Sequence, residues 1–181
     1  MNTSFLTRDE LLALGFRSVG RDVRVSRLAS IYGAEEMTLG DHVRIDDFCV
    51  LSGRVTVGSH VHVSAYAALY GAQGIVLEDY TGVSPRTTIF SAMDDFGGDW
   101  LIGPMNEAGT THVTGGEVRL CRYSQLGAHC VVFPGVTVGE GAVAGAMTLV
   151  NRPLAPWGVY AGCPARRLRD RSRGLLRFVG P

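Results

Sequence analysis

The sequence predicts an all-β fold in which the chain winds into a parallel β-solenoid with the cross-section of a triangular prism. Three observations predict it. An apolar residue recurs every six positions from 39 to 56 and from 120 to 155, a Gly or another small residue often follows it, and the fifth position of most units is small. A short period held this long is typical of stacked coils. Three hexapeptides form one coil, so each hexapeptide supplies one face.

A short helix is expected over about 7 to 15, ahead of the first coil. Thr7-Arg8-Asp9-Glu10 has the pattern of a capping box, apolar residues follow it, and Gly15 is placed to end the helix. We expect residues 1–18 to cover the open end of the solenoid, because terminal strand edges need covering.

The β-helix domain is expected over 19–165, with coils that begin at Val19, Leu39, Val57 and Leu77, and with the period resuming at Leu120. An inserted loop at 91–116 breaks the period. A loop of this length is either functional or disordered, and its three Asp and two aromatic residues favour function. Residues 166–181 are rich in Arg, with Leu and Phe interspersed, and are expected to form a basic helical tail.

Composition narrows the possible partners and the compartment. The net charge of zero argues against nonspecific nucleic-acid binding. No apolar run approaches the roughly 20 residues that span a bilayer, and the N-terminus lacks the pattern of a secretory signal. Cys49 and Cys130 occupy fifth positions, and no CxxC pattern occurs. We therefore expect packed free thiols and a cytoplasmic protein.

The period continues through 138–146 and ends in Ala161-Gly162-Cys163-Pro164-Ala165-Arg166. With this ending, the chain resembles the hexapeptide-repeat, left-handed β-helix acyltransferases. It is most similar to the branch that O-acetylates sugars, galactosides and lipopolysaccharide. The resemblance implies a left-handed solenoid and a homotrimer with active sites between subunits. It also implies acetyl-CoA as cosubstrate, no metal, and direct attack of the acceptor on the thioester.

The resemblance also implies which residues bind the cosubstrate. Small residues of the last coils would line the pantetheine arm, Asn151 would lie near the adenosine end, and two Arg would meet the phosphates. Gln125 stands where several relatives carry Trp. The implied cofactor residues are Ala128, Gly145, Ala146, Asn151, Pro164, Arg166 and Arg169.

The general base is the open question. Many relatives carry a His where the six-residue frame places Asp94, followed here by Asp95. An Asp acts as a base when burial or a neighbouring carboxylate raises its pKa. Sugar-hydroxyl binding and a structural turn are the alternatives for these two carboxylates.

Histidines are the other candidate bases. His62 lies on an outward face and His112 lies late in the inserted loop, and a near-neutral pKa suits either to this role. His42, His60 and His129 occupy fourth positions near corners, where polar residues are ordinary.

We therefore predict an acetyl-CoA-dependent O-acetyltransferase that modifies a hydroxyl of a sugar or polysaccharide precursor in a ternary complex. N-acetylation of a nucleotide-linked amino sugar and acetylation of a xenobiotic are the alternatives. A zinc-dependent carbonic anhydrase of the same fold needs three suitably spaced His, and the five His of this chain lack that spacing. A noncatalytic scaffold has no use for the Ala161–Arg166 ending.

Overall fold

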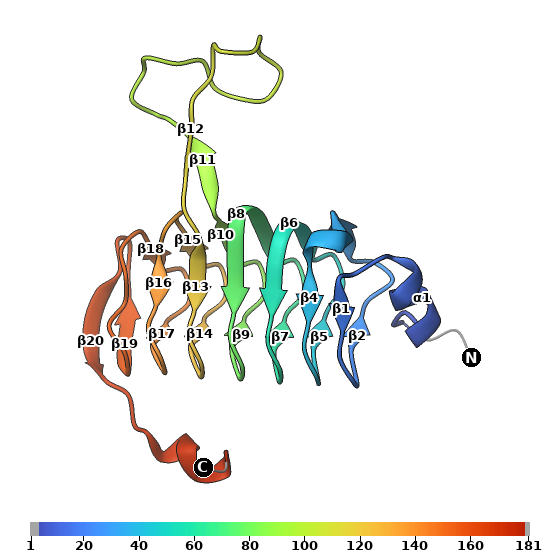
Figure 1. The fold of residues 1–181 in the computed structure, drawn as a ribbon. Coiled ribbons are helices and arrows are strands. Elements are labelled where there is room, and N and C mark those ends of the chain that lie inside the picture. Colours follow the sequence, from blue (N-terminus) through green and yellow to red (C-terminus); the bar gives the residue numbers. More distant parts are fainter. Residues whose placement is uncertain (1–3, 180–181) are drawn as a thin grey trace.

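Stacked coils of short parallel strands form a triangular prism, and a long arm projects from one of its corners (Figure 1). The computed structural model describes residues 4–179. The ends of the expected N-terminal and C-terminal regions, residues 1–3 and 180–181, lie outside the described part. Within it, the strands form a ten-stranded sheet, an eight-stranded sheet and a two-stranded arm. The predicted β-solenoid is confirmed.

Each face of the prism contains one hexapeptide from every coil, and the faces are numbered in the order in which the chain passes through them within a coil. The first face carries β1 (Ser18–Val19), β4 (Thr38–Leu39), β13 (Val118–Leu120) and β16 (Thr137–Val138). The third face carries β3 (Ser30–Tyr32), β10 (Thr88–Phe90), β15 (Val131–Val132) and β18 (Leu149–Val150). Strands β6 (Val50–Val57) and β8 (Ala68–Leu77) pass from the third face to the first, and η1 (Ala34–Glu36) turns the same corner in the first coil.

The second face is the eight-stranded sheet. Its strands are β2 (Arg24–Val25), β5 (Arg44–Ile45), β7 (His62–Val63), β9 (Gly82–Val83), β14 (Gln125–Leu126), β17 (Val143–Ala144), β19 (Gly158–Ala161) and β20 (Arg166–Asp170). All neighbours are parallel except β19 and β20. Parallel stacking lets each coil satisfy the backbone groups of the next; for example, the Val50 N–H donates to the Ala67 carbonyl at 2.9 Å.

The six-residue period correctly predicted which residues form the hydrophobic core. Most residues that open the hexapeptides point inward and are fully buried, as for Leu39, Leu77 and Leu126, whereas Val19 and Ile31 of the first coil are partly buried. The fifth positions also point inward, where only small side chains fit between coils. Cys49 and Cys130 fill two of them as buried free thiols, which confirms the packing expected of them.

The corners require a left-handed backbone, which few residues other than Gly adopt readily. His42, His60 and His129 have φ of 56°, 59° and 59°, so all three lie at corners, as predicted. The rings of His42 and His60 stack at 4.7 Å, and His60 stacks on Tyr80 at 4.6 Å. His42 and His60 therefore belong to an aromatic column along the edge between the first and second faces, whereas His129 lies on the edge between the second and third faces.

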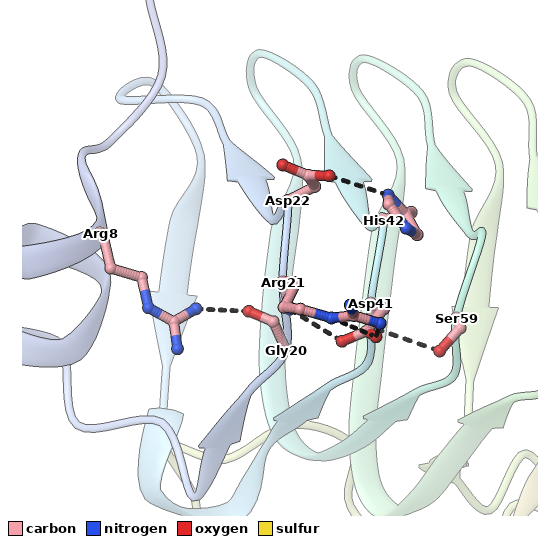
Figure 2. A network of polar contacts seen from close by, with 7 residues as sticks. All are labelled: Arg8, Gly20, Arg21, Asp22, Asp41, His42 and Ser59. Carbon is pink, nitrogen blue, oxygen red and sulfur yellow. Dashed lines mark hydrogen bonds and ion pairs between the residues drawn. The ribbon is translucent and has the colours of Figure 1, made fainter.

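The N-terminal helix α1 (Arg8–Ala13) closes one end of the prism (Figure 1). Thr7 and Glu10 form the predicted capping box, and Leu11 is buried against the first coil. Figure 2 shows how the Arg8 guanidinium donates to the carbonyl of Gly20. The helix thus covers the open end of the solenoid, as expected.

Polar contacts also tie successive coils together at this end (Figure 2). Arg21 and Asp41 form an ion pair at 2.7 Å, and Asp22 pairs with His42 at 3.2 Å. The Asp41 N–H donates to the Ser59 hydroxyl of the following coil at 3.1 Å. These contacts link three consecutive coils along one edge.

The C-terminal tail differs from the expected helix over its first part. Strand β20 pairs antiparallel with β19 and supplies hydrogen bonds to the last coil, whose edge would otherwise be open. A helical segment comes only later, as the 3₁₀ helix η2 (Gly174–Phe178). Arg171 anchors the turn between them, because its guanidinium donates to the carbonyls of Tyr123 and Gly141. No helix in the described part of the chain is long and apolar enough to cross a membrane.

Candidate active site

The inserted loop is an antiparallel arm built on β11 (Ala92–Asp94) and β12 (Val113–Gly115). It leaves the prism at the corner between the third and first faces (Figure 1). Asp94 ends β11 and is half-buried, and its Oδ1 accepts a long hydrogen bond of 3.4 Å from the Gly103 N–H. Asp94, which the six-residue frame of the sequence selected, therefore lies at the base of the arm.

Asp94 borders a pocket of about 470 Å³ between the arm and the third face. The other lining residues are Phe90, Ala92, Met93, Phe96 and Phe133, all of them apolar. A carboxylate in an apolar recess is a common arrangement for a group that binds or deprotonates a ligand.

Asp95 has a different environment although it is adjacent in sequence. Its Oδ1 accepts from the Gly97 N–H at 2.8 Å, and its own N–H donates to the His112 carbonyl at 2.9 Å. Asp95 is not among the lining residues of the pocket. The structure therefore favours the turn-forming alternative for Asp95 and separates it from Asp94.

The two candidate histidines lie on different parts of the fold. His62, on β7 of the second face, pairs with Asp46 through Nε2 at 2.7 Å. Burial opposes ionisation of Asp46, but hydrogen bonds from His62 and Arg44 hold the pKa of this carboxyl below its usual value. His112 is exposed on the arm, where its ring lies 5.5 Å from that of Trp100. His112 thus lies on the arm close to Asp94, because the adjacent Val113 pairs with Asp94, whereas His62 lies on the second face of the prism.

The implied pantetheine residues do gather along one prism edge. This edge, between the second and third faces, consists of Ser84, Gly127, Ala128, Gly145 and Ala146, and we call it the small-residue edge. Backbone bonds hold the column in register: the Ser84 N–H donates to Leu126, and the Gly127 N–H donates to Ala144. These five residues have no bulky side chains, so the backbone between the larger corner residues Arg86, His129 and Met147 stays accessible to a ligand.

The remaining implied cofactor residues flank this edge near the last coil. The Ala165 N–H donates to the Leu149 carbonyl at 2.9 Å, which places Pro164 and Arg166 above the edge. Arg166 pairs with Ala161 on β19, whereas Arg169 pairs with Val159, farther across the second face. Because β20 is extended, the two Arg lie about 10 Å apart along the strand rather than on one helical face. Asn151 directly follows β18 on the third face.

Ser84 is a polar member of the small-residue edge that the sequence did not single out. Its hydroxyl accepts a hydrogen bond from Gln125 Nε2 at 3.1 Å. Gly82 provides the space for Gln125, since a Cβ there would lie 2.1 Å from Gln125 Oε1. With one lone pair engaged, the Ser84 hydroxyl proton remains available to donate to a bound group.

Burial raises the pKa of the Cys49 thiol to about 11, and it also raises the pKa of Cys130. Neither is a ready nucleophile. Within residues 4–179, no group of three or more His, Cys, Asp or Glu side chains is arranged to hold a metal ion.

No family model matches the chain. Over 178 residues it is 32% identical to a dTDP-4-amino-4,6-dideoxy-D-glucose acyltransferase of Escherichia coli, a match that covers 97% of this chain and 93% of that protein. Together with the prism, this relative makes the protein an acyltransferase of the left-handed β-helix class. More particularly, the chain belongs to the hexapeptide-repeat acyltransferase family.

The solved structures include AntD, an N-acyltransferase from Bacillus cereus. It is 42% identical, with a TM-score of 0.95, and the match covers 98% of this chain and 96% of AntD. AntD has been solved with dTDP-4-amino-4,6-dideoxyglucose and coenzyme A, and with dTDP and 3-hydroxybutyryl-CoA. AntD variants S84T and D94N have also been solved. The present chain carries Ser84 and Asp94 at the same numbers.

Similarity to an O-acetyltransferase is more local. The galactoside O-acetyltransferase of Escherichia coli strain K12 is 42% identical over 45 residues, which is 25% of this chain and 22% of that protein.

Proposed function

We propose that the protein transfers an acyl group from an acyl-CoA to the amino group of a nucleotide-linked amino sugar, with a dTDP-linked 4-amino-4,6-dideoxyhexose as acceptor. The observation that carries the proposal is the match along the whole chain to AntD, an N-acyltransferase solved with such an acceptor. The O-acetyltransferase match spans only a quarter of the chain. Among the acceptor classes expected from the sequence, the comparisons therefore favour the amine of a nucleotide-linked sugar over a sugar hydroxyl.

The small-residue edge supports the cosubstrate half of this proposal. A pantetheine arm is extended and carries amides, so it binds well along a column of accessible backbone groups without bulky side chains. Ala128 and Ala146 fit this role. Arg166 is exposed beside the last coil, which supports a role in binding a phosphate of CoA, since a guanidinium suits that role.

In the proposed reaction, the acceptor amine attacks the thioester carbonyl. A carbon–nitrogen bond forms, the carbon–sulfur bond breaks, and CoA leaves as a thiolate. Asp94 accepts the proton that the nitrogen loses, and this proton finally reaches the departing sulfur, so the products are an amide and free CoA. Its position in an apolar recess supports this role, because water there does not compete for the proton.

The Ser84 hydroxyl is proposed as a hydrogen-bond donor to the bound ligands. Gln125 donates to it and so directs its proton outward from the edge. A fixed donor of this kind stabilises negative charge that develops on a carbonyl oxygen.

We further propose that the active sites form between copies of the chain in a homotrimer. The arm supports this, because it exposes several large apolar side chains along its length, with Phe96, Ile102 and Met105 exposed by 70%, 57% and 95%. Exposed apolar clusters of this kind mark interfaces. A neighbouring copy would cover them and close the site.

The matched pair Asp94→Asn and Asp95→Asn tests the chemistry. If Asp94 is the base, Asp94→Asn should lower kcat by roughly 10²- to 10⁴-fold. Asp95→Asn should change kcat little, because an Asn side-chain oxygen can still accept from the Gly97 N–H. The measurement is release of free CoA with dTDP-4-amino-4,6-dideoxyglucose as acceptor. An effect of Asp94→Asn confined to the KM of the acceptor would instead make Asp94 a sugar ligand.

The acceptor class is tested in the same assay with the dTDP-linked sugar that carries a hydroxyl in place of the amine. We expect turnover only with the amine. Comparable or faster turnover with the hydroxyl compound would return the assignment to O-acylation.

A further inference from the structure

The pocket beside Asp94 is markedly apolar for a site that handles a sugar. Four large side chains, Phe90, Met93, Phe96 and Phe133, and the methyl group of Ala92 form its walls, and Asp94 is the one polar side chain among its lining residues. Phe96 is 70% exposed and marks the open mouth, whereas Phe90 and Phe133 are half-buried and form the floor.

The floor is built by the register of the coils. Ile89 pairs with Val132, so the residues that follow them, Phe90 and Phe133, lie side by side on the outer surface of the third face. Tyr70 of the preceding coil stacks on Phe90 with ring centroids 5.3 Å apart. The floor is therefore a preformed aromatic surface and does not depend on the arm for its position.

The column of outward side chains that contains Tyr70, Phe90 and Phe133 continues towards the residues expected to bind the cosubstrate. Val132 pairs with Val150, so Asn151, which follows Val150, is the next member after Phe133. The third face that carries this column begins at the small-residue edge, where Ala146 lies. A thioester that follows this edge would thus reach the pocket across a single face of the prism.

The apolar lining of the pocket distinguishes between two possible occupants, the hexose of the acceptor and the acyl chain of the cosubstrate. A hexose presents several hydroxyl groups, and each one buried without a partner costs roughly 1–3 kcal/mol. The walls offer these groups only one carboxylate. A hydrocarbon chain makes no such demand and gains from every apolar contact.

We propose that this pocket receives the acyl chain of the cosubstrate, and that the protein prefers acyl groups of about four carbons to acetyl. The proposal rests on the proposed function, because it assumes an acyl-CoA as donor. It departs from the acetyl-CoA predicted from the sequence. AntD, solved with 3-hydroxybutyryl-CoA, shows that a relative of this fold holds an acyl group of that size.

The first test compares butyryl-CoA with acetyl-CoA at a fixed concentration of the amino-sugar acceptor. Each buried methylene is worth about a 4-fold gain, so two methylenes should raise kcat/KM roughly 15-fold. A ratio at or below one would overturn the proposal.

Variants of Phe133 locate the effect. Phe133→Gln keeps a side chain of similar length but makes the floor polar, and it should bring the butyryl-to-acetyl ratio close to one. Phe133→Leu keeps the floor apolar and should preserve most of the preference. Tyr32→Ala removes an exposed aromatic residue of the first coil and should leave the ratio at the wild-type value. Because the readout is a ratio within each variant, a loss of folded protein does not mimic the effect. An unchanged ratio in Phe133→Gln would contradict the assignment of this pocket.

Direct binding separates the failure of this inference from that of the proposed function. Calorimetric titration with CoA, acetyl-CoA and butyryl-CoA should give the tightest binding for butyryl-CoA. If none of the three binds, the acyl-CoA-dependent function itself is wrong, and this inference falls with it. If all three bind equally, the donor is correct but the pocket does not hold the acyl chain.

Discussion

The Cys49 thiol provides a quantitative test of how tightly the coils pack. Burial raises its pKa to about 11 from an ordinary value of 9.0, and its Sγ–H donates to the Ser64 carbonyl at 3.1 Å. The folded protein therefore keeps a proton that the unfolded chain loses once the pH exceeds 9. Because the unfolded state alone gains from ionisation there, stability should fall as the pH rises from about 9 towards 11.

The size of the effect follows from the two pKa values. At pH 10.5 the difference in proton binding should cost the fold roughly 2 kcal/mol relative to neutral pH. Cys49→Ala removes this contribution and should fit the fold, because the next coil carries Ala67 at the equivalent position. The variant should lose some stability at neutral pH from the vacated volume. That deficit should shrink or reverse at pH 10.5.

Urea unfolding of both proteins at pH 7.5 and 10.5, at one protein concentration, measures the difference. Cys163→Ala, which removes an exposed thiol, is the control and should keep the pH dependence of the wild type. If the stability gap between wild type and Cys49→Ala stays constant within about 0.5 kcal/mol between the two pH values, the burial argument fails.

Two further predictions concern the candidate site. Gly82→Ala places a Cβ against Gln125 Oε1 and should destabilise the protein by roughly 1–3 kcal/mol. In a double-mutant cycle, most of this loss of stability should disappear in a Gln125→Ala background. Full additivity of the two substitutions would show that the clash is relieved elsewhere. Arg166→Ala should raise the KM for acyl-CoA by roughly 10-fold if the guanidinium binds a phosphate. Arg177→Ala, in the distal tail, should leave this KM unchanged. Equal effects of the two substitutions would indicate a nonspecific loss of positive charge.

The core of the prism could be predicted from the sequence because one physical rule determines it. Inward positions take apolar or small side chains, including the buried Thr81, Thr87 and Thr148. The backbone repeats the same geometry every coil, so the frame that places Leu39 also places Leu126. Even the corners follow, since His42 and His129 occupy the same step of the repeat.

The tail could not be predicted in the same way. Residues 166–170 have an Arg-rich pattern that local propensity interprets as helical, but their conformation is decided by a distant partner. The exposed edge of β19 needs hydrogen bonds, and β20 supplies them. A contact of this kind has no signature in the local sequence.

From the residue pattern alone, the candidate site could be predicted only where the period breaks, and the implied cofactor residues depended on the family resemblance. Asp94 was found because the frame ends just before it. Ser84 follows the frame without any irregularity, and Ser64 holds the same step one coil earlier, so a single sequence gives no reason to select it. His62 has suitable chemistry, but its pairing with Asp46 depends on coil stacking that sequence spacing alone does not reveal.

The way in which the arm is inserted has an evolutionary consequence. On one side of the insertion, β10 stays paired with β8 and β15, and on the other side β13 stays paired with β8 and β16. The coil stack is thus continuous across the point where the arm departs. Mutations, insertions or exchanges within the arm can reshape its side of the recess beside Asp94 without disrupting the strand pairing between coils. Selection can therefore change the walls that the arm contributes while preserving the coil stack, which also carries the aromatic floor of Phe90 and Phe133.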